Sequence, residues 1–319
     1  MKELPALPLS HGVLERCRIA ARRQRRPGLL GGHQMRRKGQ SLDFKEYRHY
    51  LPGDDIRHVD WRASVRHGAE TDLLVRQFSA EEQLTLVISL DLRMTMRLPQ
   101  AMPKVLIALW LAEAISSILL RSGDQVLLHP LFASHNRQVQ VIRGRTGSAQ
   151  VRRHLNNMWT HKPGDGLTLN LDSLQRHLKP TAVWLIISDF YFHPNDGQHL
   201  ARTLAEAQDG YGWVLTLDLD SWPHERLLLG QGARRIEGPG SGFGFMEPNP
   251  VEIDGDGLSR VEREIFLHKE AFRERCMHGG LDALHWEWPP EEEPDAAAFF
   301  TEQFQNDKVL KRLFMRESS

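Results

Sequence analysis

Two aspartates stand directly after apolar runs that predict buried strands. Residues 84–90 and 182–188 are rich in β-branched and other apolar side chains, and Asp91 and Asp189 follow them. Such continuous runs are typical of central parallel strands that are covered on both faces. Because ligands of open α/β sheets gather at the carboxyl ends of the strands, we expect both carboxylates at one ligand-binding edge.

A second polar cluster lies before the first of these strands and mixes acids with arginines and a tryptophan. In the structural interpretation, the arginines bridge carboxylates, Trp61 buries its ring, and the segment is held against the sheet. In the functional interpretation, the cluster is a recognition surface for a partner. A third interpretation is a metal-dependent hydrolase centred on Asp54, Asp55, His58 and Asp60. The side chains concerned are Asp54, Asp55, Arg57, His58, Asp60, Trp61 and Arg62.

The elements that position these residues alternate between strands and helices. Such alternation indicates an α/β fold with a mostly parallel, doubly wound sheet, preceded by an irregular, partly β N-terminal segment. Ser148 is the predicted cap of one of the helices. Strands are expected at 84–90, 125–132, 137–142, 182–188, 213–217 and 284–288, and helices at 103–121, 148–159, 171–178, 198–208, 258–277 and 296–314.

Composition divides the chain into four expected parts. A basic, partly disordered arm (1–40) precedes a segment that packs on the sheet (41–83), the sheet domain (84–290), and a linker with a C-terminal helix (291–319). Forty-one basic and 41 acidic side chains cancel, so net charge does not point to nucleic acid or a membrane. Two cysteines without a CxxC motif, and no signal peptide or membrane-spanning stretch, predict a cytoplasmic protein.

The polar cluster also carries a family resemblance. Together with the strand at 84–90, it resembles the domain of unknown function 58 (DUF58) family, in which E-x-R-x-Y-x-x-G-D-D-x-R-x-x-D-W precedes a von Willebrand factor A-like domain. The resemblance implies that the chain binds partners without performing chemistry and accompanies a MoxR-type AAA+ ATPase. The matching residues are Glu46, Arg48, Tyr50, Gly53, Asp54, Asp55, Arg57, Asp60 and Trp61.

The resemblance further implies a metal-ion-dependent adhesion site, whose first loop has the pattern D-x-S-x-S. Here Asp91 and Thr95 fit that loop, but Arg93 replaces the first serine, and a guanidinium cannot ligate a cation. Thr168 and Asp189 match the second and third loops. Three interpretations stay open. In the first, Mg²⁺ or Mn²⁺ binds through Asp91, Thr95, Thr168, Asp189 and water. In the second, Arg93 replaces the metal by pairing with Asp91 or Asp189. In the third, the aspartates only cap loops.

The expected function is therefore a non-enzymatic adaptor or co-chaperone that uses the strand-end loops to bind the ATPase or a client protein. An alternative is a nucleic-acid-associated factor that uses the basic arm between Arg16 and Lys38. That arm lacks the interleaved aromatic residues on which single-stranded bases stack, which disfavours this alternative.

Overall fold

The structure is a computed structural model. The chain forms two compact units. One unit comprises residues 26–83, and the other comprises residues 1–25 and 84–319. The residues described are 3–19, 42–51, 56–66, 73–80, 84–134, 139–144, 146–161, 167–174, 177, 182–210, 212–230, 235–236, 251–252, 255–291 and 293–316. Most of the predicted basic arm, from residue 20 onward, lies outside them.

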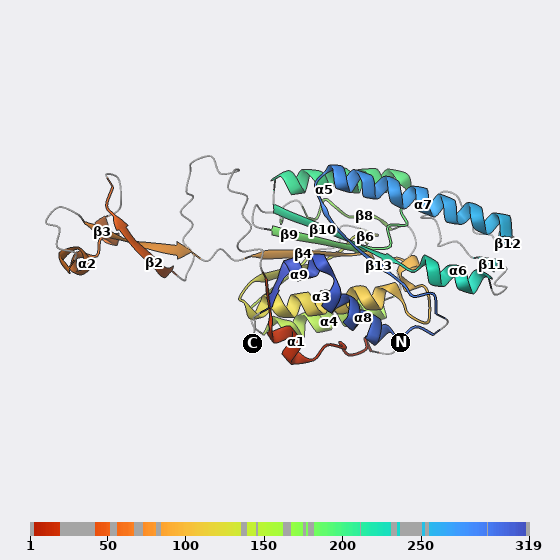
Figure 1. Cartoon of the computed structure of the whole chain (residues 1–319), viewed down its shortest axis with the longest axis horizontal. Helices are drawn as coiled ribbons and strands as arrows, with labels where there is room; N and C mark the ends of the chain where they lie inside the picture. The colour runs from red at the N-terminus through yellow and green to blue at the C-terminus, as the bar shows by residue number, and fades with distance from the viewer. Residues whose placement is uncertain are drawn as a thin grey trace. The chain divides into compact units, whose positions relative to one another are not determined.

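A six-stranded sheet forms the centre of the larger unit (Figure 1), in the order β13-β10-β9-β4-β5-β7. The four pairings from β13 to β5 are parallel, and only the edge strand β7 is antiparallel to its neighbour. This confirms the predicted α/β class with a mostly parallel sheet. The strands are β4 (Thr85–Leu90), β5 (Gln125–Pro130), β7 (Gln140–Arg143), β9 (Ala182–Ser188), β10 (Gly212–Asp220) and β13 (Asp282–Glu287).

The apolar runs of the central strands are continuous because both faces of the sheet are covered. In β4, Leu86 and Ile88 belong to one hydrophobic cluster, and Val87 between them belongs to the other. The first cluster includes side chains of α3 (Lys104–Arg121), α4 (Gly147–Thr160) and α8 (Ala296–Asn306). The second includes side chains of α5 (Pro194–Gly210) and α7 (Gly255–His278), on the opposite side of the sheet in Figure 1.

Helix α3 is apolar around nearly its whole circumference because other elements cover its outer side. It contacts α4, α8 and the N-terminal segment, and the Trp110 indole donates to the Pro5 carbonyl at 3.1 Å. The helix ends before Gly123, which has φ +80°, a left-handed conformation that glycine adopts without strain. The predicted helix and its end are therefore confirmed.

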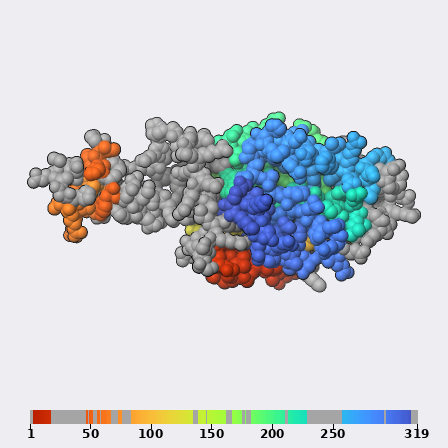
Figure 2. Space-filling model, in the orientation of Figure 1, coloured from red at the N-terminus to blue at the C-terminus, as the bar shows by residue number. Residues whose placement is uncertain are grey.

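The first part of the predicted arm belongs to the core of the larger unit. Leu4, Leu9, Leu14 and Cys17 are buried in the cluster that contains α3. The short helix α1 (His11–Glu15) leads into β1 (Cys17–Ile19), which pairs antiparallel with β14 (Phe314–Arg316). Figure 2 shows these red N-terminal residues beside blue C-terminal ones. The boundary at residue 40 therefore differs from the structure.

The smaller unit is built on an antiparallel hairpin of β2 (Leu42–His49) and β3 (Leu74–Ala80), with a bulge between Phe44 and Glu46. A 3-10 turn, η2 (Ile56–His58), precedes helix α2 (Trp61–Arg66). The Asp60 carboxylate accepts hydrogen bonds from the backbone N–H groups of Arg62 and Ala63, both at 3.1 Å. Asp60 therefore caps α2, as aspartates commonly do at helix N-termini.

Several local predictions were wrong. Ser148 lies inside α4, whose N-cap is Thr146. The described residues of 171–178 form turns instead of a helix. The predicted helix at 296–314 is divided at Asp307 into α8 and α9 (Lys308–Leu313) and ends in β14. Helix α6 (Trp222–Gly230) was not predicted.

Among the described helices, none has both the length and the apolar composition that crossing a bilayer requires.

A buried histidine joins the central strands and makes stability depend on pH. His129 Nε2 lies 2.7 Å from the Asn170 carbonyl, so this nitrogen carries the proton, and Nδ1 accepts from Ser89 Oγ at 2.9 Å. Ser89 in turn accepts from the Trp184 indole N–H at 2.8 Å. Burial lowers the pKa of His129 from 6.5 to about 4.

We therefore expect the chain to lose stability as pH falls from about 6.5 to about 4. In this range the unfolded chain binds a proton and the folded chain does not. Protonation therefore lowers the free energy of unfolding by up to about 3 kcal/mol. Urea unfolding at several pH values, with His129→Gln as comparison, measures this contribution. If the assigned imidazole resonances of His129 titrate near 6.5 in the folded protein, the expectation is wrong.

Candidate functional site

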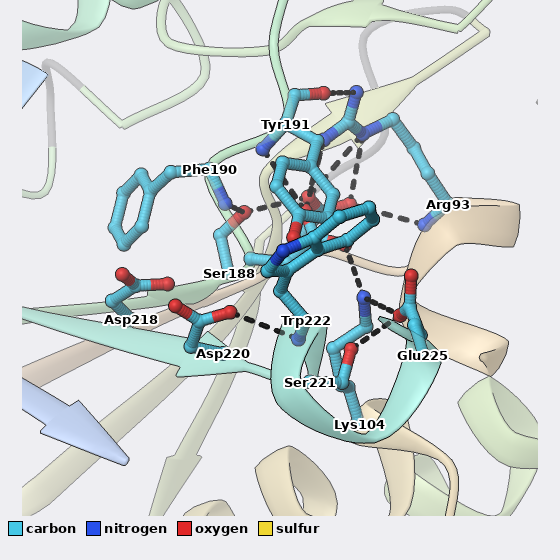
Figure 3. A network of polar contacts seen from close by, with 12 residues as sticks. Arg93, Lys104, Ser188, Phe190, Tyr191, Asp218, Asp220, Ser221, Trp222 and Glu225 are labelled. Atoms are coloured by element: carbon cyan, nitrogen blue, oxygen red, sulfur yellow. Dashed lines mark hydrogen bonds and ion pairs between the residues drawn. The ribbon is translucent and has the colours of Figure 1, made fainter. Parts of the chain in front are cut away.

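The candidate site lies where β4, β9 and β10 end at the same edge of the sheet (Figure 3). Asp91 follows β4, Asp189 follows β9, and β10 ends with Asp218 and Asp220. The carboxyl ends of parallel strands point the same way, so the register of the sheet alone brings these acids together. Asp91 and Asp189 are completely buried.

Asp91 is held by its own loop and by the neighbouring strand. Its Oδ1 accepts from the Arg93 backbone N–H at 3.1 Å and from Arg93 Nε at 3.0 Å. Its Oδ2 accepts from Arg93 Nη2 and from Ser188 Oγ, both at 2.7 Å. The guanidinium thus binds the carboxylate through two nitrogens, the strongest geometry available to this pair.

Arg93 makes further contacts that fix its guanidinium over the strand ends. Nη1 donates to the Tyr191 carbonyl at 3.0 Å, and the charged group lies 4.1 Å from the ring centre of Phe132 and 5.0 Å from that of Phe192. Burial by itself would lower the pKa of Arg93, but the charge and hydrogen bonds of Asp91 and the charge of Asp189 raise it. The side chain is therefore a permanent cation with mostly internal partners.

Asp189 is neutralised by a second cation, Lys104, the first residue of α3. Lys104 Nζ lies 3.0 Å from Asp189 Oδ2 and 3.4 Å from Glu225 Oε1, and Arg93 Nη2 lies 3.8 Å from Asp189 Oδ1. Figure 3 shows Arg93 and Lys104 reaching the network from different sides. Burial favours protonation of Asp189, but the charges of Lys104 and Arg93 outweigh it and lower its pKa.

The loop after β9 is bent by a residue in a left-handed conformation. Phe190 has φ +54°, which is uncommon for an aromatic residue and costs backbone energy. Its N–H donates to Ser188 Oγ at 2.9 Å, and the Tyr191 N–H donates to Asp189 Oδ1 at 3.2 Å. The Phe190 ring stacks on Phe272 with centres 4.6 Å apart. These contacts hold the bend and direct the Tyr191 carbonyl toward Arg93.

A neighbouring acidic group at the end of β10 also has an internal cation. Oxygens of Asp218 and Asp220 and a nitrogen of His285 lie within 4.8 Å of one another, a spacing that a metal ion could bridge. Lys269 Nζ, however, lies 3.0 Å from Asp218 Oδ1 and 3.2 Å from Asp220 Oδ1. The pKa of Asp218 is lowered by Lys269 and His285 against the effect of burial.

In this arrangement the donor set does not fit a divalent cation. Mg²⁺ requires near-octahedral oxygen ligands with no competing positive charge, whereas the oxygens of Asp91 and Asp189 already face Arg93 and Lys104. Thr95 Oγ1 is buried without a hydrogen-bond partner among the described residues. Thr168 is exposed in β8 (Thr168–Leu169), and its hydroxyl donates to the Ala133 carbonyl at 3.4 Å.

Of the site residues predicted from sequence, the structure joins Asp91, Arg93 and Asp189 in one network. Lys104, Ser188 and Glu225 were missed. A single lysine at the start of an otherwise apolar helix was the available signal for Lys104. Ser188 ends the apolar run before Asp189. Glu225 gave no signal because helix α6 was not predicted.

The family-motif residues belong to the smaller unit. Glu46 and Arg48 lie in β2, and the Tyr50 N–H donates to the Leu73 carbonyl at 2.7 Å. The buried Asp60 also accepts from the Tyr47 hydroxyl at 2.9 Å. The Trp61 side chain is exposed within the smaller unit, and the interpretation that it packs on the sheet stays a prediction. Gly53, Asp54 and Asp55 lie outside the described residues.

Comparison with models of known protein families shows which family the chain belongs to. The model of a protein family of unknown function, DUF58, matches residues 46–242, which is more than half of the chain. The chain belongs to the DUF58 family. The match spans the motif of the smaller unit and, in the larger unit, all strand ends of the candidate site. No curated protein matches this DUF58 chain.

The buried position of Lys104 makes it a sensitive test of this network. We expect Lys104→Met to lower the free energy of unfolding by about 3–5 kcal/mol, because Asp189 loses its nearest cation. Glu225→Gln, which alters the more exposed partner of Lys104, should cost about 1 kcal/mol or less. Urea denaturation followed by circular dichroism measures both variants. Equal stability of Lys104→Met and the wild type would contradict the described pairing.

Proposed function

We propose that this DUF58 protein is a non-enzymatic adaptor that binds a MoxR-type AAA+ ATPase or its client through the loops at the strand ends. Membership of DUF58 and the resemblance of its motif support the partner. The mostly parallel sheet with aspartates after β4 and β9 supports a von Willebrand factor A-like domain. The proposal for the site rests on its internal charge pairing.

In the proposed site, Arg93 and Lys104 take the place of a metal ion. The observation that carries this is the two-nitrogen contact of Arg93 with Asp91, together with the ion pair of Lys104 with Asp189. Each carboxylate is thereby neutralised by a side chain of the same chain. The network then supports the loops and leaves no open coordination position for a partner's carboxylate.

Direct contact with the partner would come from apolar residues of the loop after β4. Met94 begins the short 3-10 helix η3 (Met94–Arg97), one residue after Arg93, and Leu98 follows it. Both are exposed, Met94 by 53% and Leu98 by 46%, although the loop between them and Asp91 is fixed by hydrogen bonds. Exposed apolar side chains on a rigid loop favour binding because little conformational entropy is lost.

The two alternatives have less support from the described residues. For a hydrolase at Asp60, the carboxylate already accepts from Arg62, Ala63 and Tyr47, which leaves little capacity for a metal or a reacting group. For a nucleic-acid factor, the relevant part of the chain is the basic arm. Within its described part, Arg16 Nε already donates to the Gly12 carbonyl at 3.2 Å. The basic residues from position 20 to 38 lie outside the described residues.

The loop after β4 is tested with a matched pair of double variants. Met94→Ala with Leu98→Ala should weaken binding to the purified MoxR-type ATPase by about tenfold or more. The control is Met277→Ala with Leu267→Ala on α7, because these side chains are similarly exposed, by 56% and 50%. Biolayer interferometry gives both affinities.

Two results would contradict the proposal. If both double variants bind the ATPase equally well, the interface lies elsewhere on the chain. If the wild type does not bind any MoxR-type ATPase of the same cell, with or without nucleotide, the proposed partner is wrong.

The proposed replacement of the metal predicts how the site responds to Mg²⁺. Millimolar Mg²⁺ should not raise the melting temperature of the wild type, because a ligand stabilises only a state that binds it. Arg93→Ser restores a D-x-S-x-T loop and removes one competing cation, so this variant should be less stable but should gain stability from Mg²⁺. Thermal unfolding with Mg²⁺, EDTA and K⁺ measures the response. Stabilisation of the wild type by Mg²⁺ would show that the metal binds despite Arg93.

A further inference from the structure

The smaller unit exposes apolar side chains that its own fold does not use. Trp61 and Val65 of α2 are exposed by 57% and 80%, and Ile56 of η2 is also exposed. Trp61 and Val65 are four residues apart and therefore lie on the same side of the helix. Trp61 and Val65, with Arg62 and Arg66, are called the α2 face below.

The buried side of α2 explains why these residues point outward. Ser64 is buried, its hydroxyl donates to the Asp60 carbonyl at 2.8 Å, and it accepts from the Leu74 N–H of β3 at 2.8 Å. The helix is thus fixed to the hairpin by polar contacts of Ser64 and Asp60. Within this unit, Trp61 and Val65 are left on the exposed side of the helix, where two neighbouring large apolar side chains are a candidate contact surface.

The charge of the α2 face has one sign. Arg62 and Arg66 are exposed, as is Arg57 of η2. Asp60 is the only acid between positions 56 and 66. It is buried, and its carboxylate accepts three hydrogen bonds from within the unit. The exposed side chains of this stretch are therefore apolar or cationic, without an acidic neighbour in the same stretch.

We propose that the α2 face binds an acidic segment of a partner protein that also carries apolar side chains. Tryptophan and arginine are among the residues that most often contribute a large share of the binding energy, and such residues cluster near the centre of protein interfaces. The two arginines select for anionic groups such as carboxylates, and the aliphatic Val65 requires an apolar counterpart. A nucleic acid could place phosphates on the arginines and a base on Trp61, but it would offer Val65 no apolar side chain. This surface is additional to the strand-end loops and does not depend on the AAA+ proposal.

The test uses the full-length chain and defined probes. Fluorescence anisotropy is measured with a labelled amphipathic peptide of Glu and Leu, a matched peptide of Lys and Leu, and a single-stranded oligonucleotide. The acidic peptide should bind and the basic peptide should not. Trp61→Ala, and Arg62→Glu with Arg66→Glu, should each weaken binding about tenfold or more, and added salt should weaken it as well.

Matched variants on another exposed surface control for general charge and apolar effects. Arg260→Glu and Phe266→Ala lie on α7, where both side chains are exposed, and should leave the affinity unchanged. Absence of acidic-peptide binding, or equal loss with the α7 variants, overturns the proposal. Tighter binding of the oligonucleotide that also depends on Trp61 would assign the face to nucleic acid instead.

A photo-crosslinking amino acid at position 65 identifies what covers the face. Crosslinks to the acidic peptide, reduced by Arg62→Glu with Arg66→Glu, support the proposal. Crosslinks that fall predominantly within residues 84–319 of the same chain, and are not displaced by the peptide, would overturn it. Because these side chains are exposed, the variants should fold, which circular dichroism verifies.

Discussion

Two completely buried carboxylates on adjacent strands are the constraint on which the rest of the site depends. Neighbouring strands of a sheet are about 4.8 Å apart, so Asp91 and Asp189 would repel each other strongly if neither had a counter-charge. A cation must therefore be present at this edge whenever both are ionised. The chain supplies two, and the elements that carry them are placed accordingly: α3 begins with Lys104, and the loop after β4 returns Arg93 to Asp91.

The two cations are not equivalent. Arg93 is planar and charged at every ordinary pH, so it fixes the direction of the loop as well as its charge. Lys104 is a compact charge that joins Asp189 to Glu225 and lies 5.0 Å from the ring centre of Tyr191. Lys269 lies 4.8 Å from the same ring, so one aromatic residue separates the two acidic groups of the edge. Removal of one member of such a buried pair is costly, because it leaves an uncompensated charge in the interior.

The sequence allowed the central sheet to be predicted because β4 and β9 consist almost entirely of apolar residues and each is followed by an aspartate. The pairing of Arg93 was one of the interpretations left open. An arginine cannot ligate a cation, but the residue type alone did not show with which carboxylate it forms an ion pair. Lys104 and Lys269 were missed because a lysine on a helix ordinarily points to solvent, and only tertiary packing buries it. The exposed side of α2 could not be predicted, because composition does not reveal which side of a six-residue helix faces its hairpin.

The pairing of β1 with β14 has a consequence for the order in which the protein is made. Cys17 pairs with Arg316, so β1 can find its partner only after residues about 300 positions further along the chain have left the ribosome. Phe300 and Phe304 of α8 and Leu310 of α9 belong to the same core as Leu4 and Leu14. Until these late residues are synthesised, part of the surface of α3 has no cover. A nascent chain that ends before these residues therefore exposes part of an apolar helix, which makes chaperone binding at that stage advantageous.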